Sequence, residues 1–275
     1  MQKTNWNYPT TMWVGQDRIK DLSIACRNLN INKPLLVTDK GLASSDIIQN
    51  SLSNLKQNSF EVILYSNVIG NPTGTNVNEG VGIYRKNNCD GVIAIGGGSG
   101  LDVGKAVAFM SGQDLPIWDF EDVGDNWKKA KSNSIAPIIA VPTTAGTGSE
   151  TQSFALISDS QTGEKLACGD PNAAFRVAIL DPCLTMTQPA RVTALTGIDA
   201  LSHALESHVS TEATPASRIF SREAWKLLTK NLPDVFCNPT DIHARAAVQL
   251  GAAWAGLAIE NAMLGAAHGA ANPLT

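Results

Sequence analysis

Residues 91–106 read GVIAIGGGSGLDVGKA, an apolar run that leads through four glycines and a serine into a segment with helical spacing. Glycines let the backbone approach a ligand closely, and a helix N-terminus offers free N–H groups and partial positive charge. The stretch therefore predicts a buried strand, a phosphate-binding turn and a helix. On this motif alone, a purely structural strand-to-helix turn is the alternative.

The glycine turn departs from two common nucleotide-binding fingerprints. A GxGxxG motif beginning at Gly96 would need glycine in place of Leu101. A Walker loop ending at Lys105 would need glycine at Ser99 and serine or threonine at Ala106. ATP hydrolysis is therefore disfavoured.

Strands and helices alternate on both sides of this turn. Short apolar runs predict strands, and segments with helical spacing predict the helices between them. Strict alternation implies a parallel sheet covered on both faces. The predicted strands are 33–39, 60–66, 91–99 and 137–144, and the predicted helices are 42–58, 75–89 and 100–112.

The chain changes character in its second half. Residues 154–170 predict two strands joined by a polar turn, and after about Thr187 only helices are predicted, at 190–209, 215–230 and 241–267. The predicted fold class is an α/β N-terminal dinucleotide-binding domain with a parallel sheet, residues 1–184, followed by an all-α C-terminal domain, residues 185–275. In a two-domain enzyme, the cleft at such a boundary is the expected site.

The composition is that of a globular protein, with 275 residues, 43% hydrophobic, 17% charged and a net charge of −4. No Lys/Arg run could follow a phosphate backbone, so nucleic acid is not an expected partner. The five cysteines are scattered without a CxxC pair, which predicts neither disulfides nor a thiolate zinc site. Without a charged leader or a run of membrane-spanning length, we expect a cytoplasmic protein that does not enter membranes.

Residues 195–210 read LTGIDALSHALESHVS and place an aspartate and two histidines in an otherwise apolar helix. Four residues advance a helix by about 400°, so Asp199 and His203 project from one face, one turn apart, as a chelating pair must. His208 lies about 140° round the helix from His203 and does not join them. The alternative is an aspartate favoured by the helix dipole beside an ordinary hydrogen-bonded histidine.

Two further histidines differ in their surroundings. His268 lies among small residues in LGAAHGAANPLT, which let helices or a ligand come close, although simple helix packing explains them as well. His243 stands at a polar helix start and is expected at the surface. Asp, His and His from two helices suit Fe(II), Zn(II) or Mn(II) and leave room for further ligands.

Polar side chains also follow two other strands. Asp39 ends the first strand, where a carboxylate can accept hydrogen bonds from ribose hydroxyls and repel a 2′-phosphate, favouring NAD over NADP. A helix cap is the alternative for this residue. Thr143, Thr144 and Thr147 in VPTTAGTGSE can bind a ribose or phosphate, and alone they indicate only a turn.

Taken together, these residues resemble the iron-containing, or group III, alcohol dehydrogenases. Three motifs, GGGSxxDxxK, PTTAGTGSE and GxDAxxHAxE, occur in this order and are jointly specific; NYPTTMWVG, NPT and HGAANPLT extend the resemblance over essentially the whole chain. The resemblance implies a dehydroquinate synthase-like fold with a metal in the cleft between two domains. It also implies a homodimer or higher homo-oligomer.

The resemblance further assigns residues and a reaction. The matched metal ligands are Asp199, His203 and His268. The matched cofactor contacts are Asp39 at the adenine ribose, Gly97, Gly98 and Ser99 at the pyrophosphate, and Asn71, Asp102, Thr143, Thr144, Thr147 and Lys165. The implied reaction is reversible hydride transfer between a small alcohol or aldehyde and NAD(H), with Fe(II) as the expected metal and Zn(II) as the alternative. The ion would act as a Lewis acid on the substrate oxygen.

Two departures from the family pattern change the expectation. Family members bring a fourth histidine ligand beyond the position of His268, and no histidine follows His268 here. We therefore expect a fragment of a longer reading frame that alone binds metal weakly and unfolds easily.

Asn272 stands where many relatives carry a second histidine near the substrate. Asparagine cannot titrate, so proton exit would need water, the nicotinamide ribose or another group.

Other functions stay open from the sequence. The nearest is a reductase of another carbonyl substrate, resembling maleylacetate reductase or glycerol dehydrogenase. A non-catalytic assembly partner with the same fold predicts cofactor binding without alcohol oxidation. A sugar-phosphate lyase or synthase sharing the fold predicts tight NAD retention without net turnover. Short-chain alcohols, diols and hydroxyaldehydes all fit a small pocket between a metal and a nicotinamide.

Overall fold

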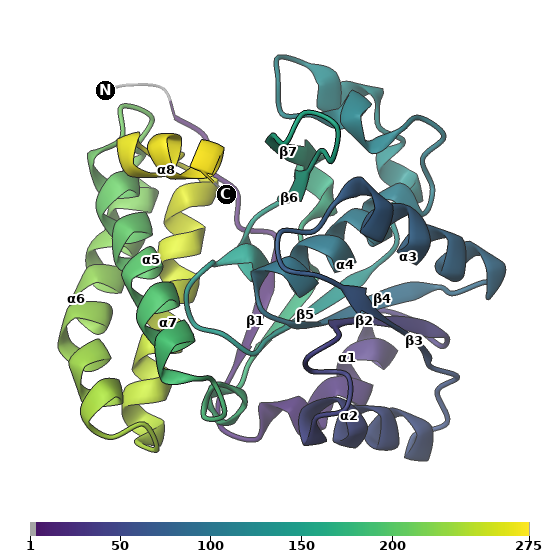
Figure 1. The fold of residues 1–275 in the computed structure, drawn as a ribbon, viewed down its shortest axis with the longest axis horizontal. Helices are drawn as coiled ribbons and strands as arrows, with labels where there is room; N and C mark the ends of the chain where they lie inside the picture. The colour runs from purple at the N-terminus through teal and green to yellow at the C-terminus, as the bar shows by residue number, and fades with distance from the viewer. Residues whose placement is uncertain (1–3, 275) are drawn as a thin grey trace.

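The computed structural model describes residues 4–274, and its centre is a six-stranded parallel sheet (Figure 1). Its strands lie in the order β1-β8-β5-β4-β2-β3, and every neighbouring pair is parallel. Strands β6 and β7 form a separate antiparallel pair. The strands are β1 (Thr11–Val14), β2 (Pro34–Asp39), β3 (Ile63–Val68), β4 (Gly91–Gly96), β5 (Ile138–Pro142), β6 (Phe154–Ser158), β7 (Lys165–Gly169) and β8 (Val177–Leu180).

Helices cover both faces of the sheet, because successive strand residues point to opposite sides. Leu35 and Val37 of β2 join the core beneath α3 and α4, whereas Leu36 between them joins the core with α1 and α2. Figure 1 shows the two helix pairs on opposite sides of the sheet. The helices are α1 (Leu22–Asn28), α2 (Asp46–Gln57), α3 (Gly74–Lys86) and α4 (Gly98–Met110). The predicted α/β class with parallel strands is confirmed.

The rest of the chain is helical and packs around its own small-residue core. Alanines such as Ala200, Ala224 and Ala252 let the long helices approach closely, and Leu228 fills the space between them. Thr214 and Asp241 each begin a helix by accepting hydrogen bonds from backbone N–H groups of its first turn. The helices are α5 (Ala190–Val209), α6 (Pro215–Cys237), α7 (Ile242–Glu260) and α8 (Ala266–Ala271).

The structure corrects two helix predictions and adds elements that were not predicted. The single helix predicted over 241–267 is wrong: α7 ends at Glu260, and Met263 then takes a left-handed φ of 62° before α8 begins. The helix predicted to end at residue 230 runs on to Cys237, because Leu232 and Val235 bury in the helical core despite Pro233. Strands β1 and β8 and helix α1 were not predicted, since all three are short.

The two parts of the chain meet along the loop after β5 and along α7. Glu260, the last residue of α7, accepts hydrogen bonds from the backbone N–H of Ser153 at 3.0 Å and from the Ser153 hydroxyl. Gly148 has a φ of 64°, and a Cβ at this position would stand 2.7 Å from Cα of Gly256 in α7. The backbones therefore touch directly, and the division at residue 184 stays a prediction.

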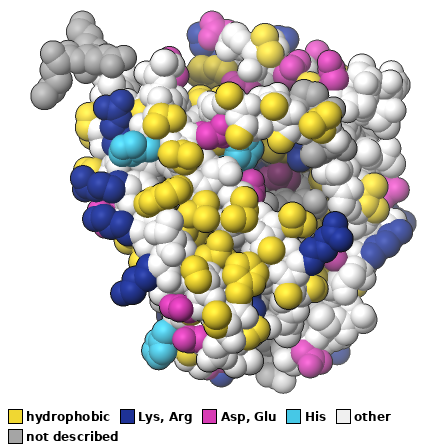
Figure 2. Space-filling model, turned by 60° about the vertical axis from the view of Figure 1, so that its left-hand side comes forward, with side chains coloured by type: hydrophobic (Ala, Val, Ile, Leu, Met, Phe, Trp, Pro, Cys, Tyr) yellow, Lys and Arg dark blue, Asp and Glu magenta, His cyan; other side chains and the backbone are white. Residues whose placement is uncertain are grey.

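The outer side of the helical part carries exposed apolar residues. Leu195, Ile198, Leu205 and Val209 of α5 are each more than half exposed, and Figure 2 shows apolar side chains gathered on this side of the molecule. Even so, none of the helices formed by residues 4–274 is both long and apolar enough to cross a lipid bilayer.

Candidate metal and nucleotide site

The glycine turn lies where β4 ends and α4 begins, and it forms one wall of a cavity of about 650 Å³. A Cβ on Gly98 would stand 2.7 Å from Cγ2 of Thr147, and a Cβ on Gly97 would stand 3.2 Å from Cγ2 of Thr144. A side chain at either position would press against these threonines, so the glycines let the α4 N-terminus lie close to the loop after β5. The first turn of a helix carries unpaired N–H groups and partial positive charge, which suits a pyrophosphate.

Other predicted cofactor residues line the same cavity. Asp39, at the end of β2, reaches it from one side, and Thr143 and Thr144 reach it from the end of β5. The Oδ1 of Asp39 accepts a hydrogen bond from the backbone N–H of Leu42 at 2.9 Å, so the side chain also caps the turn after the strand. Capping and ribose binding are compatible, because the carboxylate has a second oxygen.

A second cavity of about 380 Å³ adjoins the first, and Gly98 and Ser99 line both. It holds the remaining predicted residues: the cofactor candidates Asn71, Asp102, Thr147 and Lys165, and the metal candidates Asp199, His203 and His268. Asn272 lines it as well. The structure thus brings every site residue predicted from the sequence to one of two adjoining cavities, beside the carboxyl ends of the parallel strands, where α/β folds bind ligands.

Asp102 lines the second cavity, and its carboxylate is also hydrogen-bonded within the protein. Its Oδ1 accepts a hydrogen bond from the Ser149 hydroxyl, and its Oδ2 accepts one from the backbone N–H of Leu156 at 3.3 Å. The two carboxylate oxygens therefore tie α4 to the loop after β5 and to strand β6, so Asp102 shapes the cavity as well as lining it.

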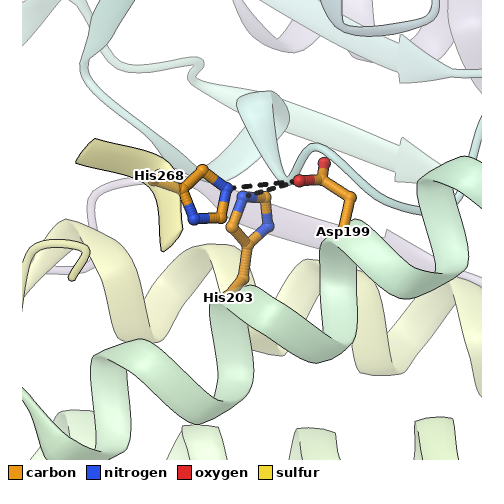
Figure 3. A group of neighbouring side chains, drawn as sticks. All are labelled: Asp199, His203 and His268. Atoms are coloured by element: carbon orange, nitrogen blue, oxygen red, sulfur yellow. Dashed lines mark hydrogen bonds and ion pairs between the residues drawn. The ribbon is translucent and has the colours of Figure 1, made fainter. Parts of the chain in front are cut away.

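Asp199, His203 and His268 turn toward one another from two helices (Figure 3). Oδ1 of Asp199 lies 3.4 Å from Nε2 of His203 and 3.2 Å from Nε2 of His268. One ligand atom from each residue lies within 4.8 Å of the others, and the two rings stack with centroids 4.6 Å apart. His208 points elsewhere, with its Nδ1 2.9 Å from the Ser221 hydroxyl, as the helical spacing predicted. His243 is exposed, as its polar helix start predicted.

Electrostatics favour the protonation states of a metal site at Asp199 and His203, whereas the hydrogen bond with Asp199 raises the pKa of His268. Burial would raise the pKa of Asp199, but the hydrogen bond from His268 and the charges of both histidines outweigh it and lower that pKa. Burial holds the pKa of His203 below its usual value, against the attraction of Asp199. An ionised carboxylate and a neutral imidazole are the protonation states that metal binding requires. One carboxylate oxygen and two imidazole nitrogens therefore fit a divalent first-row metal.

One close contact of this cluster was not singled out from the sequence. Glu206 lies on α5 with its Oε2 2.5 Å from Nδ1 of His268, and its Oε1 accepts a hydrogen bond from the backbone N–H of Ala267 at 2.6 Å. The signal that could have found it is the spacing of Asp199, His203 and Glu206, which places all three on one face of a helix.

A buried ionic network behind the second cavity was also missed. The side chain of Lys105 on α4 is 1% exposed, and its Nζ donates hydrogen bonds to the carbonyls of Ser149 and Phe154 at 2.9 and 3.0 Å. Burial lowers the pKa of Lys105, and burial raises the pKa of nearby Glu150 to about 7. The network binds the loop that carries Thr147 to the helix that carries the glycine turn.

Glu150 gives the protein a testable pH dependence. Its folded-state pKa of about 7 lies above the ordinary value of 4.5, so its protonation favours the folded state at low pH. That contribution disappears as the pH rises through 7, a loss of about 3 kcal/mol at most. We expect Glu150→Gln to have a higher Tm than the unmodified protein. This increase in Tm should be several degrees larger at pH 8 than at pH 5. Thermal unfolding followed by circular dichroism measures this; an equal difference at both pH values would contradict it.

Comparisons with known proteins bear on the family of this chain. A family model described as "Iron-containing alcohol dehydrogenase" matches residues 9–182, and one described as "Fe-containing alcohol dehydrogenase family, C-terminal" matches residues 193–275. The NAD-dependent methanol dehydrogenase of Bacillus methanolicus is 36% identical over 265 residues, which cover 96% of this chain and 68% of that protein. The 1,3-propanediol dehydrogenase of Klebsiella pneumoniae is 32% identical over 268 residues, covering 97% and 68%.

Solved structures show the same similarity. The sulfoacetaldehyde reductase from Bifidobacterium kashiwanohense, solved in complex with NAD+, superposes with a TM-score of 0.92 at 31% identity, covering 100% of this chain and 72% of that one. A 1,3-propanediol oxidoreductase superposes with a TM-score of 0.90 at 31% identity, covering 96% and 68%. The chain thus spans about two thirds of the length of the curated relatives it matches.

Proposed function

The chain belongs to the iron-containing alcohol dehydrogenase family, and from this premise we propose that it interconverts small alcohols and aldehydes by hydride transfer with NAD(H). The observation that carries the proposal is the shared wall of the two cavities. Gly98 and Ser99 line both the larger cavity, which suits a dinucleotide, and the smaller one, which holds the aspartate and two histidines. A nicotinamide that enters past this wall would reach a substrate beside those three side chains.

In the proposed mechanism, the protein supplies positions and charges. Asp199, His203 and His268 would hold the ion, the glycine turn would hold the pyrophosphate, and the cofactor candidates named above would hold the ribose and nicotinamide. A bound divalent ion, Fe(II) or alternatively Zn(II), would supply Lewis-acid polarisation of the substrate oxygen, and a bound NAD+ would supply the hydride acceptor. Asn272 lines the smaller cavity and cannot titrate, so the alcohol proton would leave through water or the nicotinamide ribose.

A panel of small aldehydes tests the proposed function. The purified protein is given NADH and one aldehyde at a time, with added Fe(II) under anaerobic conditions, with Zn(II), or with a chelator. We expect NADH oxidation that depends on both the aldehyde and the metal. NADH binding without oxidation under any of these conditions would instead favour a non-catalytic member of the family.

The charge of Asp39 is predicted to make the protein prefer NAD to NADP. Replacing it by asparagine keeps an oxygen for the Leu42 N–H and removes the charge that would repel a 2′-phosphate. We expect Asp39→Asn to raise the ratio of kcat/KM for NADPH to that for NADH about tenfold, equivalent to about 1.4 kcal/mol. Asp46→Asn, an exposed change at the start of α2, is the control. An unchanged ratio would remove Asp39 from cofactor selection.

A further inference from the structure

The third metal candidate, His268, lies on an element that needs support. Helix α8 spans only Ala266–Ala271 and follows a turn that contains the left-handed Met263. A helix this short is marginal without tertiary contacts. The ligands Asp199 and His203, in contrast, belong to a helix of 20 residues that packs against α6 and α7.

Glu206 on α5 fastens α8 at two points. Its Oε1 accepts a hydrogen bond from the backbone N–H of Ala267, an N–H of the first turn of α8 that has no partner within a helix. Its Oε2 lies 2.5 Å from Nδ1 of His268. A Cβ on Gly265 would stand 3.0 Å from Oε1 of Glu206, so glycine gives the carboxylate room to reach the helix start.

The contact between Oε2 of Glu206 and Nδ1 of His268 sets the orientation of the imidazole ring. This contact holds Nδ1 of His268 against the carboxylate on α5. Nε2 is then the nitrogen that faces Asp199, at 3.2 Å from Oδ1.

We propose that Glu206 is a positioning residue that holds α8 and turns Nε2 of His268 toward the metal. This proposal rests on the proposed metal site. One face of α5 thereby provides two ligands directly and orients the third. The side chain of Glu206 is 10% exposed, so its hydrogen bonds compete little with water. Partners of this kind that fix a ligating histidine affect metal affinity by about 10- to 100-fold.

Zn(II) affinity, measured by competition with a chelator at fixed pH, tests this role without relying on turnover. We expect Glu206→Ala to raise the Kd for Zn(II) by about 10- to 100-fold. Glu206→Gln keeps the size of the side chain but can accept at only one of the two contacts. Its Kd for Zn(II) should therefore lie between that of the unmodified protein and that of Glu206→Ala. Glu212→Gln, an exposed change just beyond α5, is the matched control and should bind as the unmodified protein does.

A double-variant comparison separates positioning from general support of the fold. In a His268→Ala background, Glu206→Gln should cause no further loss of Zn(II) affinity, because the residue acts through that imidazole. An equal loss in both backgrounds would overturn the proposal, as would unchanged Zn(II) affinity in folded Glu206→Gln. If the unmodified protein does not bind Zn(II) at all, the proposed metal site fails, which is a different outcome.

Discussion

Replacing His203 by alanine is expected to lower kcat/KM for aldehyde reduction by about 1000-fold, equivalent to about 4 kcal/mol of transition-state stabilisation. His203 is 5% exposed, and its Nε2 faces Oδ1 of Asp199 at 3.4 Å. Its removal takes away one of the three candidate ligands. Metal content by mass spectrometry and steady-state kinetics with NADH together measure the effect.

His208→Ala is the matched control for this variant. It also removes an imidazole from α5, but His208 turns away from the cluster and contacts the Ser221 hydroxyl. We expect unchanged metal content and a change in kcat/KM of less than about twofold, within the range usual for a residue away from the site. A His203→Ala protein that keeps full metal content and full turnover would contradict the assignment of the metal site.

Gly98→Val is expected to weaken NADH binding by at least about 100-fold, which corresponds to about 2.7 kcal/mol. The first added carbon would already stand 2.7 Å from Cγ2 of Thr147, and the branches of valine enlarge the clash. The glycine turn would have to shift, and the added methyl groups would cover the helix N-terminus that suits the pyrophosphate. Quenching of tryptophan fluorescence on titration with NADH measures the Kd.

Gly82→Ala on α3 controls for the loss of a glycine. A Cβ at Gly82 would meet no atom within 4 Å, so alanine fits without rearrangement. We expect unchanged NADH affinity and a gain in stability of up to about 1 kcal/mol, the helix-propensity difference between the two residues. Equal NADH affinity in Gly98→Val and the unmodified protein would place the dinucleotide elsewhere.

The elements that were predicted well from the sequence are those in which consecutive residues are buried and apolar. Strands β2, β4 and β5 lie inside the sheet, so almost every residue is apolar and the runs stand out. Strand β1 lies at the edge, has four residues and buries none of them fully, so it left no comparable pattern. The end of α7 was missed because the small apolar residues after Glu260 continue to read as helix, although Met263 breaks it.

The candidate site was predictable where one helix or one turn sets the geometry. Asp199 and His203 follow from helical spacing alone, and the glycine turn follows from its place between strand and helix. Lys105 and Glu150 could not be inferred, because their environment arises where α4 meets a loop more than forty residues away. The contact between Glu206 and His268 likewise joins residues 62 apart in the chain. Such pairings depend on the tertiary fold.

The central claim is that a hydride passes between the cofactor in the larger cavity and a small substrate beside the aspartate and two histidines. A deuterium label tests it most directly: the Fe(II)-loaded protein is incubated anaerobically with a small aldehyde and NADH deuterated at one or the other face of C4. The account predicts that one of the two labelled cofactors, and not both, delivers deuterium to C1 of the alcohol, in step with NADH oxidation. NADH oxidation without deuterium in the alcohol from either label would contradict it.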